Sequence, residues 1–183
     1  VEDVEPYQSE ERKQNNPATY DSYNDINKEY DVIISNAVLN VIPDDWRADV
    51  LHNMADKLKV GGMLFINTRK AGEEKNIKDK IELDSPQEVL VKRNGKIASY
   101  QRFFTPKELQ TWVQEELGEG YVVEIANEKN SGTKGLAAVV VKKVSETNPR
   151  KLATDAVMQA LENTGIKVHR ATREQAEAVI GAQ

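Results

Sequence analysis

The stretch Tyr30-Asp31-Val32-Ile33-Ile34-Ser35-Asn36 decides the fold of this 183-residue chain. Its β-branched run is apolar on both faces, which is typical of a strand buried in a parallel sheet. Asp44 follows as a candidate cap for a helix over residues 45–58. Gly61-Gly62 should end that helix, and Met63-Leu64-Phe65-Ile66-Asn67 is a second buried strand. Strand, helix and strand in this order predict a right-handed βαβ unit with parallel strands.

Apolar side chains in the predicted helix fall on one face. Val50, Leu51, Met54 and Leu58 recur at helical spacing, so we expect them to face the sheet. His52 lies between them in sequence and is expected to be an exposed helix residue.

A charged segment follows the second strand. Residues 68–85 are poor in large apolar side chains, which indicates an exposed insertion. Asn94-Gly95 then separates two β-prone runs, residues 89–93 and 96–100. Because both turn residues tolerate positive φ, this dipeptide favours a tight two-residue turn. We therefore expect a small antiparallel hairpin after the insertion.

The clearest helix start is Thr105-Pro106-Lys107-Glu108, a capping box with proline at the first helical position. This helix is expected to end at Gly118. Residues 121–125 and 136–141 have the composition of strands and are joined by a polar turn, so they should pair antiparallel. The whole pattern predicts an α/β fold.

The composition of residues 144–150, with Ser, Thr, Asn and Pro, is typical of a linker. Residues 1–143 therefore form the predicted main domain. Residues 151–183 form a helix-strand-helix extension, a small α/β tail too short to hold a core alone. We expect the tail either to pack on the main domain or to belong to the next domain of a longer chain.

Charge is unevenly distributed along the chain, whose net charge is -5. Residues 1–30 hold eight acidic and three basic side chains, and the remainder carries 22 of each. Because the residues after position 30 are neutral overall, we expect no broad basic surface that could bind the phosphate backbone of a nucleic acid. No apolar run approaches the roughly 18 residues of a membrane span, and the acidic start is not a signal peptide. These features predict a cytoplasmic protein.

The content of metal-ligating residues is low. The chain has no Cys and only two His, His52 and His169. No disulfide framework, thiolate site or histidine-rich metal cluster is therefore expected.

The predicted βαβ unit resembles a known family. Asp31-Val32-Ile33-Ile34-Ser35-Asn36-Ala37, the helix ending in Leu58-Lys59-Val60-Gly61-Gly62, and residues 63–67 look like the fourth strand, the following helix and the fifth strand of class I S-adenosylmethionine-dependent methyltransferases. Leu39-Asn40-Val41-Ile42 and Tyr100-Gln101-Arg102 are most similar to methyltransferase-like domains of phages and mobile elements. The resemblance covers roughly residues 1–143. It implies a Rossmann-like, mostly parallel sheet with a C-terminal antiparallel strand pair.

The resemblance also implies cofactor-binding residues. The family ends its second strand with an acid that accepts both ribose hydroxyls, and Glu5 is the preferred equivalent, with Asp3 second. Asp21 fits the place of the acid or amide that meets the adenine amino group. The remaining candidates end or follow the fourth strand, where open α/β sheets bind ligands: Ser35, Asn36 and Ala37.

Acceptor binding is less well specified by the resemblance. Asn40 follows the same strand, and Tyr100 and Arg102 fall where class I enzymes often recognise the acceptor. Lys92, Arg93, Lys96 and Arg102 form a local basic patch, either a grip for a phosphate-bearing substrate or a solvated hairpin face. No catalytic base is assigned, and the acceptor is unknown.

The resemblance is incomplete at the amino end. The family's first strand ends in a glycine-rich turn that lets the backbone approach the cofactor, and the given sequence has no such segment before Val1. We therefore expect the N-terminal βα unit to be missing. Two functions stay open: a fragment of an S-adenosylmethionine-dependent methyltransferase domain, or a non-catalytic scaffold or interaction module of a larger mobile-element protein. The open sheet edge favours pairing with a second copy or a neighbouring domain.

Overall fold

The computed structural model of the chain describes residues 2, 4, 14, 15, 18–20, 25–85, 87–126 and 135–146. Backbone contacts divide the chain into two units, Val1–Glu146 and Thr147–Gln183, and all described residues belong to the first. The predicted extension, residues 151–183, lies outside the described residues. The predicted domain boundaries therefore stay predictions.

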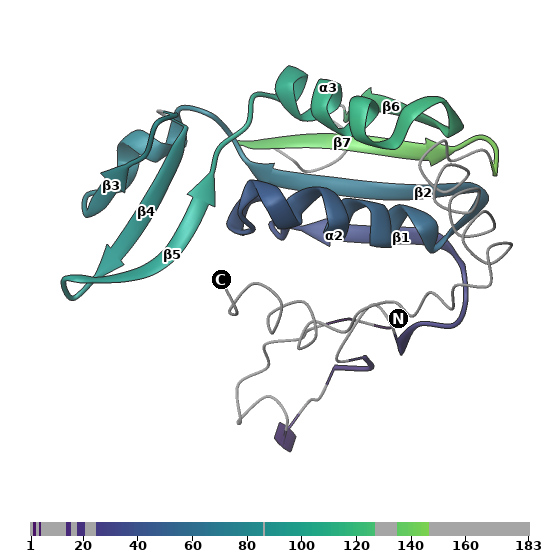
Figure 1. Cartoon of the computed structure of the whole chain (residues 1–183), viewed down its shortest axis with the longest axis horizontal. Helices are drawn as coiled ribbons and strands as arrows, with labels where there is room; N and C mark the ends of the chain where they lie inside the picture. The colour runs from purple at the N-terminus through teal and green to yellow at the C-terminus, as the bar shows by residue number, and fades with distance from the viewer. Residues whose placement is uncertain are drawn as a thin grey trace, which may run out of the picture. The chain divides into compact units, whose positions relative to one another are not determined.

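A four-stranded mixed sheet forms the centre of the described fold (Figure 1). β1 (Tyr30–Asn36) and β2 (Leu58–Arg69) run parallel, and α2 (Asp44–Asp56) connects them. β7 (Leu136–Lys143) pairs antiparallel with β2, and β6 (Tyr121–Ile125) pairs antiparallel with β7. The strand order is β1-β2-β7-β6. The predicted α/β, Rossmann-like fold, with its βαβ unit and C-terminal antiparallel pair, is confirmed.

Helices α2 and α3 (Pro106–Leu117) cover the same face of this sheet. Of the helix residues predicted to face the sheet, Leu51 and Met54 are buried and Val50 packs partly against the core. The core combines helix side chains with alternate residues of the strands. Its members include Leu39, Leu51, Met54, Leu58, Leu64, Ile66, Leu109, Val113, Leu117, Tyr121, Val139 and Val141.

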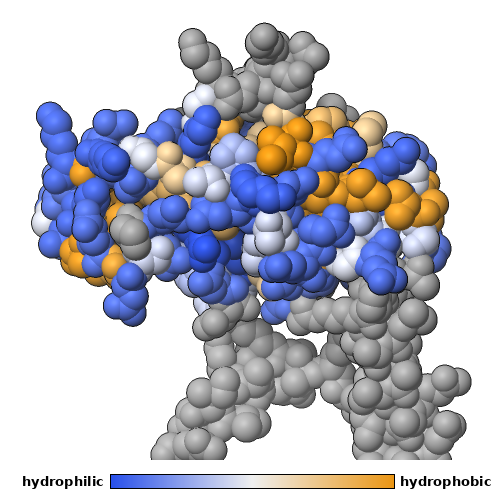
Figure 2. Space-filling model, turned by 90° about the horizontal axis from the view of Figure 1, so that it is seen from above, coloured by the Kyte–Doolittle hydropathy of each residue, from blue (hydrophilic) through white to orange (hydrophobic). Residues whose placement is uncertain are grey.

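The opposite face of the sheet exposes apolar side chains. Val32 is in register with Met63, and Ile34 is in register with Phe65. All four are at least one third exposed, and Ile34 reaches 69%. Figure 2 shows apolar surface gathered over the part of the molecule that carries this sheet. The described fold is therefore asymmetric, with helices packed on one face and apolar surface on the other. The prediction that these two strands are buried is wrong for this second face.

The helix after β1 starts and ends earlier than predicted. Its N-cap is Pro43, so Asp44 is the first helical residue and not the predicted cap. The Asp44 carboxylate instead accepts hydrogen bonds from the side chains of Arg47 and Arg102. At the other end, the Lys57 carbonyl accepts from the Tyr30 amide at 2.7 Å. This pairing with β1 pulls Leu58 out of the predicted helix and into β2.

The glycine pair lies inside β2 and does not end the helix as predicted. Gly61 has a φ of 83°, a value that favours glycine. A Cβ on Gly62 would meet the backbone oxygens of Lys59, Tyr30 and Asp31 at 2.9 to 3.2 Å. The missing side chain therefore lets the backbones of β1 and β2 approach closely where their register shifts.

The predicted insertion is more ordered than its composition suggests. It contains η3 (Glu73–Asn76) and β3 (Lys80–Glu82), and Thr68 is buried within β2. β3 pairs antiparallel with β4 (Glu88–Arg93), and β4 pairs with β5 (Lys96–Arg102). The predicted hairpin is therefore part of a three-stranded sheet. β3 is a charged strand at the edge of this sheet. Its sequence does not indicate a strand clearly, because edge strands favour polar residues.

The predicted hairpin turn is confirmed by its backbone. Asn94 has a φ of 52° and Gly95 a φ of 73°. Two successive positive φ values match the twist of the flanking strands.

The predicted capping box of α3 is also confirmed. The Thr105 hydroxyl accepts from the Glu108 amide at 3.2 Å, and the Glu108 carboxylate accepts from the Thr105 amide at 2.8 Å. Partial burial acts to raise the pKa of Glu108, but the hydrogen bonds from Thr105 lower it below its ordinary value of 4.5. The ionised carboxylate is therefore the form that the fold prefers.

We expect this box to stabilise the domain at neutral pH and to fail in acid. Thr105→Ala should lower the free energy of unfolding by about 1 kcal/mol. Because the pKa of Glu108 is lower when folded, its contribution is present above the unfolded pKa and is lost as pH falls through the folded pKa. Urea unfolding of wild type and Glu108→Ala should therefore differ near pH 7, and the difference should shrink as pH falls below the ordinary pKa of 4.5 and through the lower folded pKa. A difference that persists in acid would contradict this, and Glu115→Ala on the same helix is the control.

Candidate functional site

The carboxyl ends of β1 and β2 lie side by side. The two strands are parallel, and Asn36 is in register with Asn67 at their ends. Ligands of open α/β sheets bind beyond this edge. Ser35 and Asn36 end β1, and Ala37 begins the connection to α2. The structure thus places these three predicted cofactor-binding residues together at the expected edge.

Ala37 has a left-handed backbone with a φ of 53°. This conformation costs a residue with a Cβ about 1–2 kcal/mol. The Ala37 amide donates to the main-chain oxygen of Asn67 at 3.0 Å and lies 3.1 Å from its Oδ1. Asn67 therefore holds a strained turn at the point where the chain leaves the sheet. Such strain is often concentrated at functional sites.

Ser35 carries an unsatisfied hydroxyl at the same edge. The residue is only 1% exposed, and its Oγ has no hydrogen-bond partner in the part of the chain that the structure describes. A buried polar group without a partner costs about 1–3 kcal/mol. The Oγ is closed to solvent, so a ligand would reach it and remove that cost only after the side chains that cover it move.

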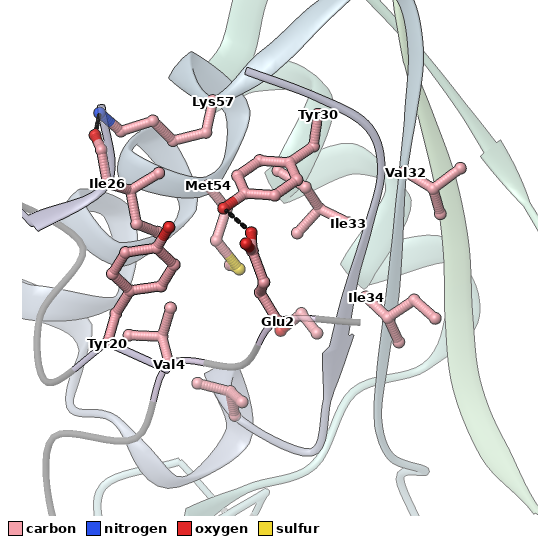
Figure 3. A pocket seen from close by; sticks show the side chains of 12 residues that line it. Glu2, Val4, Tyr20, Ile26, Tyr30, Val32, Ile33, Ile34, Met54 and Lys57 are labelled. Carbon is pink, nitrogen blue, oxygen red and sulfur yellow. Dashed lines mark hydrogen bonds between the residues drawn. The ribbon is translucent and has the colours of Figure 1, made fainter. Parts of the chain in front are cut away.

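Ser35 borders a cavity of about 680 Å³ along the outer edge of β1 (Figure 3). Among the described strands, β1 is an edge strand of its sheet. Val32 and Ile34 lie on one side of the cavity, and Val4 and Tyr20 lie opposite. A volume of this size is within the usual range of small-molecule pockets, about 300–1,000 Å³. The lining is mainly apolar, with a few polar groups.

A polar cluster lies at the amino end of β1, away from Ser35. The Tyr30 hydroxyl donates to Glu2 Oε2 at 2.8 Å, and Lys28 Nζ donates to Glu2 Oε1 at 2.6 Å. These two hydrogen bonds lower the pKa of Glu2, so it stays ionised. Burial, and then the bond to Glu2, raises the pKa of Tyr30, so its hydroxyl remains a donor. The cavity thus has an apolar middle and a polar cluster at the amino end of β1, while at the other end Ser35 is part of the lining with its Oγ closed to solvent.

Three predicted cofactor residues cannot be placed beside this cavity. Glu5, Asp3 and Asp21 lie outside the described residues, so their roles stay predictions. Glu2, which the sequence does not single out, accepts a hydrogen bond from Tyr30 of β1 in the part of the chain that the structure describes. Nothing local to Glu2 signals this contact, because Tyr30 is 28 positions away.

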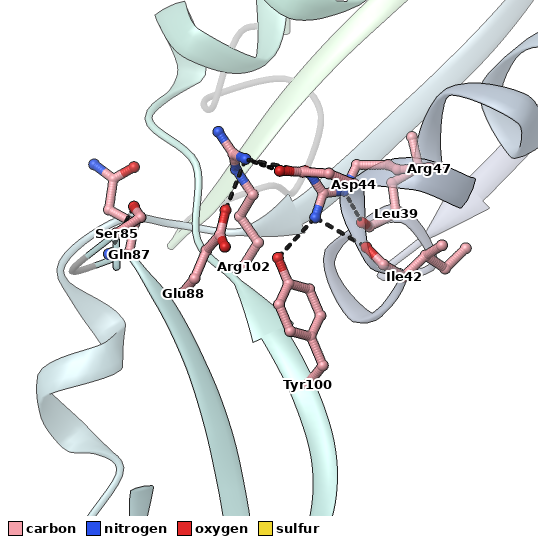
Figure 4. A network of polar contacts seen from close by, with 9 residues as sticks. All are labelled: Leu39, Ile42, Asp44, Arg47, Ser85, Gln87, Glu88, Tyr100 and Arg102. Atoms are coloured by element: carbon pink, nitrogen blue, oxygen red, sulfur yellow. Dashed lines mark hydrogen bonds and ion pairs between the residues drawn. The ribbon is translucent and has the colours of Figure 1, made fainter. Parts of the chain in front are cut away.

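The loop between β1 and α2 contains Asn40 within η2 (Leu39–Val41). Asn40 is 2% exposed, and its Oδ1 has no partner among the described residues. Arg47 holds this loop from α2, because its Nε donates to the Leu39 carbonyl and its Nη2 to the Ile42 carbonyl, each at 2.9 Å (Figure 4). The sequence placed Arg47 on a helix but gave no sign of its burial.

The other predicted acceptor residues lie on β5 and have partners within the chain (Figure 4). The Tyr100 hydroxyl accepts from Arg47 Nη2 at 3.0 Å. Arg102 Nη1 donates to Glu88 at 2.8 Å and to Asp44 at 3.1 Å. Burial raises the pKa of Tyr100, although Arg47 acts to lower it, so the hydroxyl stays protonated. A substrate-binding role for Tyr100 and Arg102 stays a prediction.

The expectation for His52 is wrong. The residue is 9% exposed, and its Nε2 lies 3.3 Å from Glu116 Oε2 on α3. His52 is buried because α3 packs against the side of α2 on which it lies. Within the described ranges, no three His, Asp or Glu side chains are grouped so that they could hold a metal ion. None of the described helices is long and apolar enough to cross a membrane.

No protein-family model matches the chain, and no curated protein matches it. Among solved structures, it is similar to an S-adenosylmethionine-dependent methyltransferase from Methanosarcina mazei, with 18% identity over 69% of this chain and 66% of that chain, and a TM-score of 0.49. It is also similar to 1,6-didemethyltoxoflavin-N1-methyltransferase from Burkholderia thailandensis, which was solved with 1,6-didemethyltoxoflavin and S-adenosylhomocysteine. The identity is 13%, the match covers 78% of this chain and 60% of that chain, and the TM-score is 0.48.

A third similar structure is an S-adenosylmethionine-dependent methyltransferase from Clostridium acetobutylicum, with 12% identity over 66% of this chain and 61% of that chain, and a TM-score of 0.44. The matched region spans less than two thirds of each of these three chains. Likeness at this level assigns no activity.

The strained turn makes a measurable prediction. Ala37→Gly should raise the free energy of unfolding by up to about 1 kcal/mol, because relief of left-handed strain exceeds the added entropy of the unfolded chain. Ala98→Gly, in β5 without a positive φ, is the matched control and should destabilise by about 0.5–1 kcal/mol. Urea unfolding measures both variants. Equal destabilisation by the two substitutions would show that Ala37 is not strained.

Proposed function

We propose that residues 1–143 are part of a class I S-adenosylmethionine-dependent methyltransferase domain and that the carboxyl end of β1 binds the cofactor. The observation that carries this proposal is the buried Ser35 Oγ, which has no partner among the described residues and belongs to the lining of the cavity next to the strained turn at Ala37. The parallel β1–β2 pair and the antiparallel β6–β7 pair support it, because they match the order that the sequence resemblance implies.

The residues present fit the proposed cofactor. A serine hydroxyl both donates and accepts, so Ser35 suits a polar group of the ligand. Val38 and Met54 add apolar lining for an uncharged part of it. S-adenosylmethionine, when bound, supplies the methyl group that is transferred. Ser35, Asn36 and Ala37 would line its pocket.

The predicted acids complete the proposed cofactor site. Glu5, or Asp3 in second place, would hold the ribose, and Asp21 would meet the adenine. Asn40, Tyr100 and Arg102 are retained as acceptor-side residues. The proposal includes the predicted phage or mobile-element context and a cytoplasmic location. The acceptor is left as a small molecule or a macromolecule.

A further strand is part of the proposal. The cavity borders β1 from Tyr30 to Ser35, a length of about 20 Å at roughly 3.3 Å per residue. The β1 edge is apolar on both sides, with Val32 and Ile34 facing one way and Ile33 the other. Such an edge favours pairing with another strand. We infer that a strand ending in a glycine-rich turn, supplied by a longer parent chain, fills the part of the cavity beside residues 30–34 and leaves the carboxyl end of β1 at Ser35 to the cofactor.

Calorimetry with S-adenosylhomocysteine tests the proposal. The chain of residues 1–183 should bind weakly or not at all, because half of the cofactor cradle belongs to the further strand. A longer version that begins upstream of Val1 and carries that strand should bind measurably. Failure of the longer version to bind would contradict the methyltransferase function and favour the scaffold alternative.

Variants of the longer version test the role of Ser35. Ser35→Ala should weaken S-adenosylhomocysteine binding by about three- to tenfold, the range expected for one hydrogen bond. Ser99→Ala, on β5 and not part of the cavity lining, is the matched control and should leave the dissociation constant unchanged. Equal affinity of wild type and Ser35→Ala would show that Ser35 does not contact the cofactor.

A further inference from the structure

The largest of the fully buried side chains in the described residues belongs to Arg47, in the first turn of α2. It is 1% exposed. Burial of a charge is strongly unfavourable unless the charge is paired and hydrogen-bonded. Arg47 meets this requirement through the carbonyls of Leu39 and Ile42, the hydroxyl of Tyr100 and the carboxylate of Asp44 (Figure 4).

Aromatic rings surround the same guanidinium. Its Cζ lies 5.4 Å from the ring centre of Phe104, 5.9 Å from that of Trp112 and 6.0 Å from that of Tyr100. Guanidinium groups are attracted to ring faces at such distances. Tyr100 belongs to β5 and Trp112 to α3, while the two bonded carbonyls belong to the loop after β1. Arg47 therefore joins three segments that are distant in sequence.

A second arginine strengthens the connection. The Asp44 carboxylate accepts from both Arg47 and Arg102, and Arg102 also donates to Glu88 on β4. The two guanidinium groups and two carboxylates alternate in space, so each charge lies beside an opposite one. Because Asp44 is shared, displacement of β5 would disturb the partners of Arg47 directly.

The loop that Arg47 holds is the one at the proposed ligand edge. Its first residue, Ala37, is held by Asn67, and Arg47 bonds to Leu39 and Ile42 further along. Asn40 lies between these two carbonyls with an unpartnered Oδ1 in the described part of the fold. The loop is thus fixed at both ends, and one of its anchors reaches the three-stranded sheet.

We propose that Arg47 is a positioning residue through which the three-stranded sheet sets the conformation of the loop after β1. A contact that moves Tyr100 on β5 changes the hydrogen bonds of Arg47 and, through them, the positions of Leu39 and Ile42. The inference rests on the proposed function only for the role of this loop in ligand binding. The coupling itself belongs to the free protein.

Amide hydrogen exchange of the ligand-free chain, followed by NMR, tests the coupling. The Val41 amide, which donates to the Val38 carbonyl at 3.2 Å, reports on the loop. Tyr100→Phe removes only the hydroxyl that accepts from Arg47, and it should speed Val41 exchange about two- to tenfold, the range for one hydrogen bond. Tyr121→Phe removes a hydroxyl that donates to Ala55 elsewhere in the core. This matched control should leave the Val41 rate unchanged once global stability is taken into account.

The reciprocal experiment separates coupling from a merely structural contribution. Asp44→Asn weakens the carboxylate that Arg47 and Arg102 share, and it should speed amide exchange both at Val41 and in β5. Arg47→Lys keeps the charge but loses the planar fork, so adding Tyr100→Phe to it should produce little further acceleration at Val41. Val41 exchange that only follows global unfolding, or fully additive effects in the double variant, would overturn the proposal. Coupling in the free chain, together with failure of the longer version to bind S-adenosylhomocysteine, would contradict the proposed function and leave this inference standing.

Discussion

The parallel pairing of β1 with β2 is the interaction on which the rest of the structure depends. It requires a crossover, which α2 supplies, and so places that helix against one face of the sheet. It also sets Asn36 beside Asn67, where the Asn67 carbonyl and side chain meet the amide of Ala37. The close approach at Gly62 makes the pairing continuous across the register shift. The strained turn and the buried serine hydroxyl both follow from this one pair of strands.

Buried charge links that pair of strands to the three-stranded sheet. Apolar packing alone would tolerate small shifts between the two sheets, whereas a guanidinium with four hydrogen-bond partners has few alternative positions. Desolvation of Arg47 is offset only in this arrangement, so the network favours one geometry strongly over others. The site edge and the three-stranded sheet are thus parts of one electrostatic unit.

Local sequence patterns predicted the structural elements that depend on a few neighbouring residues. The β-branched run of β1, the Asn94-Gly95 turn and the Thr105–Glu108 capping box each depend on a few neighbouring residues, and each is confirmed. The errors arose where distant residues decide the outcome. Pairing of Tyr30 with the end of α2 extends β2 to Leu58, and α3 buries His52. At the site, the predicted end of β1 was enough to find Ser35, Asn36 and Ala37. No local signal reveals that Arg47 donates a hydrogen bond to Tyr100, because the two residues are 53 positions apart in the sequence.

The face of the four-stranded sheet that no described helix covers has a consequence for the behaviour of this chain in solution. Val32 with Met63, and Ile34 with Phe65, form two apolar rows that run from β1 onto β2. Contiguous apolar surface next to an edge strand promotes association between molecules, because one contact can bury the apolar side chains and pair the strand edge at the same time. Solubility is therefore governed less by the net charge of -5 than by whatever shields these two rows from water.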